Sequence, residues 1–316
     1  MIILGLEIGG YEVKGLGEYI FIVLSPILEL IAPIIPGRNF PMFFEWDAFQ
    51  RALISVVLVT IIAGFLGLFL IIQNLSLIGD GLAHVSFGGI AVALVLGATS
   101  PMWWALMFSV IASIIIYELQ AREILTGDAS IAIFLTGMLA LGLVTLKLGE
   151  GAITTDIEGY LFGSVLLVST EDLNMIAMIC ILAMIVMAII GPSVLACAVD
   201  PMAARIQGLP VRGIGLLFSI VTAAVVVTMV QVIGALLVTA LLVTPAATAQ
   251  QISSSFRSSV LWTQFFGLFS VFGGLFLSSE IGGGTGSMIA LFAASMFAIV
   301  TISKSILDKV SNSNDA

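Results

Sequence analysis

Long apolar stretches recur along the whole of this 316-residue chain. Each is close to the ~20 residues that an α-helix needs to cross the hydrocarbon core of a bilayer. Since 60% of the residues are apolar and only 9% are charged, a single water-soluble core could not bury them. The sequence predicts an all-α, polytopic membrane protein with about nine transmembrane helices (eight to ten). The nine predicted spans are 52–72, 77–97, 102–118, 130–148, 172–191, 213–230, 232–250, 259–278 and 286–303.

A further apolar stretch, 19–36, contains Glu29 and three prolines. We expect it to be either an extra span or a segment on the membrane surface, within an N-terminal extension at 1–47. The main domain is expected at 48–303, followed by a cytoplasmic tail at 304–316.

Lysine and arginine residues set the expected orientation, because short cytoplasmic loops carry an excess of them. With nine alternating spans, the more basic side holds the C-terminus and the loops 118–130, 192–212 and 251–258. The opposite, outer side is acidic. Ordinary topology bias accounts for that acidity, and attraction of cations or of a basic partner is the alternative.

Several functions are disfavoured by what the chain contains. A net charge of −9 without any basic run argues against nucleic-acid binding. No phosphate-binding Walker loop occurs, so ATP hydrolysis would require another chain. Hydrolase and metalloprotease motifs do not occur either, and we do not expect an enzyme.

The segment 73–89, QNLSLIGDGLAHVSFGG, places Asp80 and His84 four residues apart. On a helix this spacing puts both side chains on one face, and a carboxylate beside an imidazole suits a divalent transition metal. Gly79 and Gly88 flank the pair. Uncharged, glycine-rich backbone at membrane depth is typical of a segment that lines a cavity. The structural alternative is that Asp80 caps the helix and His84 makes a buried hydrogen bond.

Two further segments stand out. In 199–211, Asp200 as N-cap, Pro201 in the first turn and Gly208 as a stop predict an isolated helix of about two turns on the cytoplasmic side. A soluble partner protein could bind such a helix. The alternative is a connecting loop in which Asp200 and Pro201 serve only to cap a turn. In 239–250, Pro245 interrupts an apolar stretch rich in small residues, for which close packing is the simplest interpretation.

Four motifs resemble, in the same order, those of the permeases of zinc, manganese and iron ABC importers: SLIGDGLAH, GYLFGSVLLVSTEDL, DPMAARIQGLPV and GALLVTALLVTPAATA. The resemblance covers residues 48–303 and implies the fold of the vitamin-B12-type importer permease. It also implies a homodimer in the cell membrane, docked on ATP-binding cassette subunits and supplied by an extracellular or periplasmic metal-binding protein.

The resemblance assigns roles to particular residues. The metal positions fall on Asp80 and His84. Helix breaks along the pathway fall on Gly79, Gly88 and Pro245, although Gly88 stands where a proline is common, so that break is expected to be softer. The helix that couples to the ATPase would comprise Asp200, Pro201, Ala204, Arg205, Gly208 and Pro210.

Together these features predict a conduit that carries out no covalent chemistry. The divalent metal ion is its cargo, no cofactor is bound permanently, and ATP binds the partner subunit. Lipid surrounds the chain. The alternative function is a secondary transporter or channel for a divalent cation that works without an ATPase. One carboxylate and one imidazole do not discriminate among zinc, manganese and iron.

Overall fold

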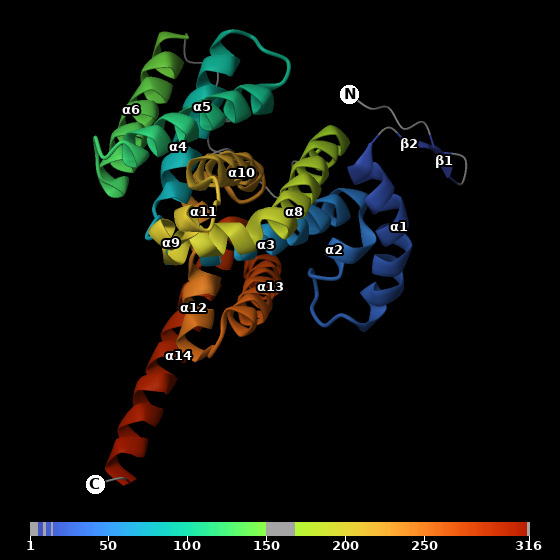
Figure 1. Cartoon of the computed structure of the whole chain (residues 1–316). Coiled ribbons are helices and arrows are strands. Elements are labelled where there is room, and N and C mark those ends of the chain that lie inside the picture. The colour runs from blue at the N-terminus through green and yellow to red at the C-terminus, as the bar shows by residue number, and fades with distance from the viewer. Residues whose placement is uncertain (1–5, 9–10, 14, 150–167, 315–316) are drawn as a thin grey trace.

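The computed structural model describes residues 6–8, 11–13, 15–149 and 168–314. The stretch 150–167, which includes most of the motif GYLFGSVLLVSTEDL, lies outside the described residues. Eight long helices form the body of the protein (Figure 1): α3 (Asp47–Ile72), α4 (Ile78–Val95), α5 (Pro101–Ala121), α6 (Gly127–Leu148), α8 (Thr170–Val199), α10 (Val211–Ile233), α13 (Phe256–Ile281) and α14 (Thr285–Asn314).

The remaining elements are short. A two-stranded antiparallel hairpin precedes the first helix, and the short helices fill the connections. These elements are β1 (Leu6–Ile8), β2 (Tyr11–Val13), α1 (Leu16–Ile31), η1 (Ala32–Ile34), α2 (Met42–Glu45), α9 (Pro201–Ile206), η3 (Ala235–Leu237), α11 (Val238–Leu242) and α12 (Thr244–Ile252).

Nine helical segments among the described residues are long and apolar enough to cross a membrane. They are the eight long helices and Leu16–Ile34. The prediction of an all-α, polytopic membrane protein is therefore confirmed.

The predicted span 232–250 is wrong as a single helix. The chain leaves α10 at Gly234, whose φ of +86° is a conformation that glycine adopts without strain. It then forms η3, α11 and α12 in succession. Pro245 lies in the first turn of α12, where its missing N–H costs nothing. Gly234 and Pro245 thus divide a stretch that is apolar throughout, so hydropathy alone predicts one continuous helix there.

The broken segment 234–252 nevertheless carries the chain from one side of the bundle to the other. Helix α13 begins beside the end of α3, where the rings of Phe256 and Phe69 are 5.4 Å apart. It ends beside the start of α3, because Glu280 accepts hydrogen bonds from the backbone of 38–40. Helix α8 runs in the same sense as α3 (Figure 1), so α10 starts at the end of the bundle where α3 ends and finishes at the end where α3 starts. The segment that joins α10 to α13 must therefore cross.

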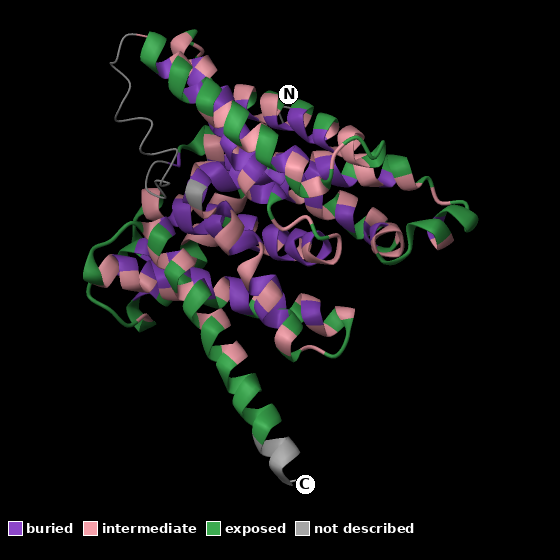
Figure 2. Cartoon of the chain, turned by 90° about the vertical axis from the view of Figure 1, so that its left-hand side faces the viewer, coloured by how far each residue is buried: buried purple, intermediate pink, exposed green. Residues whose placement is uncertain are grey.

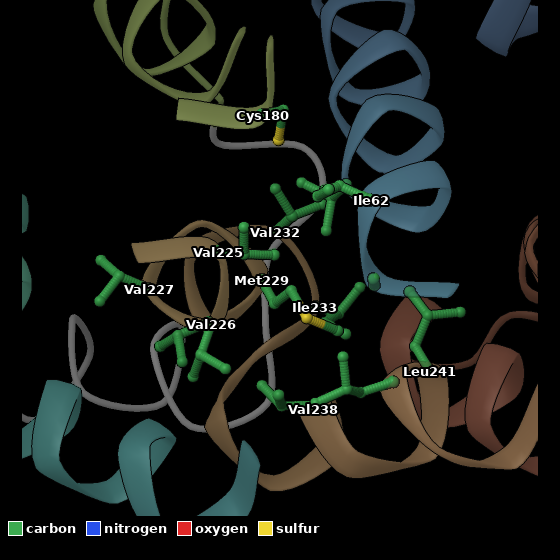
Figure 3. Close-up of a cluster of buried hydrophobic side chains, with 14 of the residues drawn as sticks. Ile62, Cys180, Val225, Val226, Val227, Met229, Val232, Ile233, Val238 and Leu241 are labelled. Atoms are coloured by element: carbon green, nitrogen blue, oxygen red, sulfur yellow. The ribbon is translucent and has the colours of Figure 1, made fainter. Parts of the chain in front are cut away.

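The core lies where α3, α4 and α10 meet, and these are the most buried of the long helices. Branched aliphatic side chains of α10 interlock there with Ile62 of α3, Cys180 of α8 and Val238 and Leu241 of α11 (Figure 3). Buried residues gather in the middle of the bundle, while the C-terminal part of α14 projects from it and is exposed over residues 302–309 (Figure 2). The outward faces of α6 and α14 are apolar and suit contact with lipid.

Candidate functional site

A sharp turn places Asp80 in the first turn of α4. The chain reverses after α3 at Asn74, which has a φ of +56°, a value uncommon outside glycine. Leu77 is the N-cap of α4, and no side chain caps this helix end. The alternative in which Asp80 is the N-cap is therefore wrong. Its carboxylate lies instead near the positive end of the helix dipole, which stabilises a negative charge.

His84 lies one turn further along the same face, as the spacing predicts. Its Nε2 is 3.9 Å from Oδ1 of Asp80, too long for a hydrogen bond. The Asp80 side chain is 33% exposed and that of His84 only 8%. Nδ1 of His84 is buried and has no hydrogen-bond partner among the described residues. A buried polar atom without a partner needs an explanation. An ion held between the imidazole and the carboxylate would bind Nε2, the nitrogen that faces Asp80, and not Nδ1.

The broken segment packs directly on this turn of α4. A Cβ added to Gly79 would lie 2.7 Å from Cδ2 of Leu242 and 3.7 Å from Oγ1 of Thr239. The Thr239 hydroxyl is itself buried and unpartnered within the described part of the chain. The fold thus places a buried hydroxyl oxygen against Gly79, the residue before Asp80, and sequence reasoning missed this neighbour. Its signal was a threonine six residues before Pro245, the residue at which we expected this apolar stretch to be interrupted.

One copy of the chain offers an incomplete metal site. Among the described residues, no group of three or more His, Cys, Asp or Glu side chains is close enough to hold an ion. Two strong ligands with one hydroxyl nearby suit an ion that must bind and leave again, since tight binding would prevent release.

The other predicted pathway residues have different surroundings. Helix α4 continues through Gly88, so the helix break predicted there is wrong. A Cβ at Gly88 would lie 2.8 Å from the carbonyl oxygen of Met138, and the glycine lets α4 approach α6 closely. Gly79 is the second residue of α4, and Pro245 does lie at an interruption, between α11 and α12. The role of Gly79, Gly88 and Pro245 in lining the ion pathway stays a prediction.

The predicted short helix is α9, on the side of the bundle opposite the start of α3. Oδ1 of Asp200 accepts hydrogen bonds from the backbone N–H of Met202 and Ala203, both 2.9 Å long. Pro201 occupies the first turn, as it does in many helices. Gly208 ends the turn that follows, with a φ of +82°. The remaining predicted residues divide by exposure: Ala204 is buried, whereas Arg205 and Pro210 are exposed.

Helix α9 presents apolar side chains outward. Met202 and Ile206 are 66% and 83% exposed. Exposed apolar side chains on a short polar-capped helix are typical of a protein–protein contact. A partner protein would find them on a rigid helix whose start Asp200 caps.

An ion-pair network ties the helix after α9 to α5. The Arg212 guanidinium donates to both carboxylate oxygens of Glu118, with Nη2 2.6 Å from each, and Arg122 donates to the same group at 3.0 Å. Helix α5 in turn packs along α4. Helix α9 packs on α8 and α10, and α10 contacts both α5 and α4, so α10 connects α9 to the helix that carries Asp80 and His84.

Comparisons with known proteins agree with this arrangement. Residues 45–304 match the family described as the ABC 3 transport family. The manganese import system permease protein ScaB of Streptococcus gordonii is 32% identical over 255 residues, covering 81% of this chain and 91% of the relative. The structure of PsaBC from Streptococcus pneumoniae in complex with Fab has a TM-score of 0.72 and 31% identity, covering 82% of this chain and 92% of the other.

A more distant structure shares the fold alone. It is an inward-facing conformation of a metal-chelate type ABC transporter, with a TM-score of 0.62, 14% identity and coverage of 90% of this chain and 98% of the other. The matched permeases and the apolar helices together make the chain a multi-pass protein of the cell membrane. The family match and the identity to ScaB extend over most of the chain, and the chain therefore belongs to the ABC 3 transport family.

Proposed function

We propose that the chain is the permease subunit of an ATP-driven importer for a divalent transition-metal ion. The observation that carries the proposal is Nε2 of His84 facing Oδ1 of Asp80 at 3.9 Å, on one face of the start of α4, where the broken segment packs on the neighbouring Gly79. Manganese is the first candidate, because the relative ScaB is named a manganese import permease. Zinc and iron stay as candidates, since both accept carboxylate and imidazole ligands.

In the proposed mechanism two copies of the chain form a homodimer. Asp80 and His84 from both copies would supply two carboxylates and two imidazoles, a plausible four-ligand set for an ion in transit. A metal-binding protein delivers the ion at the acidic outer side. ATP binding and hydrolysis on the partner subunits move α9, and α10 transmits that movement. The chain itself makes and breaks no covalent bond.

Cellular metal content measured by elemental analysis tests this function. Cells expressing the chain with its ATP-binding subunit and binding protein should accumulate one divalent metal. Cells lacking only the ATP-binding subunit should not. Accumulation without that subunit would instead favour the secondary transporter or channel.

A conservative change at Thr239 tests whether its hydroxyl serves the ion. Thr239→Val keeps the shape of the side chain and removes the oxygen, so we expect normal insertion and a several-fold slower uptake. Thr248→Val is the matched control. The Thr248 hydroxyl bonds within its own helix, to the carbonyl of Thr244 at 2.7 Å, and its loss should leave uptake unchanged. Equal uptake in both variants would remove Thr239 from the site.

The exposed face of α9 gives a test of coupling. Ile206→Glu should release the ATP-binding subunit during co-purification and reduce uptake at least tenfold, because it places a charge in the proposed contact. The side chain is 83% exposed, so the fold should not change. Gln207→Glu adds the same charge at the neighbouring exposed position and should have a much smaller effect. Unimpaired co-purification of the Ile206→Glu variant would contradict the coupling role.

A further inference from the structure

The depth of α1 in the membrane can be measured against α3. Helix α8 runs from the α1 side of the molecule toward α9, in the same sense as α3 runs from α2 toward α4 (Figure 1). The two helices meet at corresponding heights, because a Cβ added at Gly191, in the last third of α8, would lie 3.8 Å from Phe65 and 3.9 Å from Phe69, in the last third of α3. Asn174 lies seventeen residues before Gly191, which places it level with residues 48–52 of α3. Helix α13 runs antiparallel, with Nε2 of Gln264 donating to the carbonyl of Ile61 at 2.9 Å. By the same reasoning, Glu280 lies level with residue 45.

Three contacts fix the N-terminal segment to these reference points. The backbone N–H of Glu18 donates to Oδ1 of Asn174 at 2.8 Å. The Ser25 hydroxyl bonds to Oε1 of Gln50 at 2.7 Å. Further along, the backbone N–H groups of Arg38, Asn39 and Phe40 donate to Oε1 of Glu280 at 2.7–3.1 Å. All three contacts lie at the level of residues 45–52 of α3, the outer end of the bundle.

A helix that crossed the membrane would not make these contacts. Its depth would change by about 1.5 Å per residue, which separates Glu18 from Ser25 by roughly 10 Å. The two residues instead reach partners at one depth, on two different helices. Figure 1 shows α1 at the edge of the molecule, across the ends of α3 and α8. Although the segment is long and apolar enough to span, its contacts keep both of its ends at the same side.

One face of this segment is an apolar stripe that no other part of the chain covers, among the residues that the structure describes. The opposite face, including Phe21, Leu24 and Leu28, packs on the core. The stripe residues recur every three or four positions, and each is at least 40% exposed: Leu16, Tyr19, Val23, Ile27, Leu30, Ile31 and Ile34. A continuous stripe of this kind is costly in water and suits an interfacial helix, whose apolar face enters the acyl boundary by about 5–10 Å.

We propose that α1 lies in the outer leaflet interface, parallel to the membrane, with lipid acyl chains covering the stripe. The adjacent α8, which contacts α1, also exposes the apolar side chains of Met178, Leu182 and Ile185, so the apolar surface does not end with the stripe. Tyr19 in the stripe and the exposed Trp46 are the aromatic residues that membrane interfaces favour. The hairpin β1–β2 is then external. The membrane is crossed nine times, by the eight long helices and by the broken segment 234–252, and α1 does not cross it.

Labelling with a membrane-impermeant maleimide tests the external position of the hairpin. The parent is the full chain carrying Cys180→Ala and Cys197→Ala, with Asp47→Cys as the outer reference and Lys309→Cys as the inner one. In right-side-out vesicles, the Glu12→Cys variant should label as fast as Asp47→Cys, and Lys309→Cys should label only after permeabilisation. Labelling of Glu12→Cys only after permeabilisation would show that α1 crosses, and would overturn the proposal.

Spin labels on the stripe test its depth and its covering. Labels at Val23→Cys, Ile27→Cys and Ile34→Cys are placed in vesicles of phosphatidylcholine and phosphatidylglycerol. Collisions with oxygen and with a water-soluble nickel chelate should give one shared, shallow depth. A crossing helix would instead give depths spread over about 16 Å. Exclusion of both reagents, with cross-linking of Ile27→Cys between two copies, would show that a second copy covers the stripe and would overturn the lipid assignment.

Discussion

Asp80→Asn and His84→Gln are each expected to lower metal uptake to the level of cells without the ATP-binding subunit. Asparagine keeps the size of the aspartate side chain but removes the charge that attracts a cation. Glutamine keeps a polar group of similar reach but loses the imidazole nitrogens. Ionisable groups at membrane depth are costly and are retained for function. The measurement is uptake of the radioactive or isotopically enriched ion by whole cells.

The same variants should insert and fold normally. His84 and Asp80 are 3.9 Å apart, and no short hydrogen bond between them is lost. Asp308→Asn is the matched control, because it makes the same carboxylate-to-amide change at an exposed position near the end of α14. Normal uptake by either site variant, with correct insertion, would defeat the metal-ligand assignment and leave the family membership untouched.

Gly67→Ala is expected to disrupt the protein through a single methyl group. A Cβ on Gly67 would lie 1.8 Å from the carbonyl oxygen of Leu242, far inside van der Waals contact. Helix α3 or the broken segment must move, and overpacking of this kind typically costs about 1–3 kcal/mol. Because Leu242 also packs on Gly79, the displacement reaches the turn that holds Asp80. We expect a lower Tm in detergent and strongly reduced uptake.

Gly137→Ala provides the comparison for that experiment. Gly137 lies in α6, and a Cβ there has nothing within 4 Å. Alanine favours a helix by up to about 1 kcal/mol relative to glycine, so the Tm should stay the same or rise. Should Gly67→Ala show a Tm equal to that of the unmodified protein, the close packing of the broken segment on α3 would be refuted.

Features that depend on neighbouring residues in the sequence were predictable. The span expected at 77–97 is observed as α4, Ile78–Val95. The capped helix after Asp200 follows from the preference of aspartate for the N-cap and of proline for the first turn. The shared face of Asp80 and His84 follows from helical geometry alone.

Features that depend on packing between distant segments were not predictable. The predicted span 172–191 stops just before Pro192, yet α8 continues through that proline to Val199. Gly88 predicted a break, whereas its role is the close approach of α6. Thr239 lies close to Gly79 although the two residues are 160 positions apart in the chain. Hydropathy likewise shows that the stretch 19–36 is apolar, but it does not give the depth of that stretch in the membrane. The depth is set by hydrogen bonds of the N-terminal segment to Asn174, Gln50 and Glu280.

The length of α14 has a practical consequence for measuring this transporter at work. At 30 residues it is about 45 Å long, some 15 Å more than the hydrocarbon core requires. Its last turns therefore form a helical spacer beyond the bilayer rather than a flexible tether. A fluorophore attached near Asn314 would be held at a defined height, so energy transfer to a dye on the ATP-binding subunit would report the separation of two ordered bodies through the transport cycle.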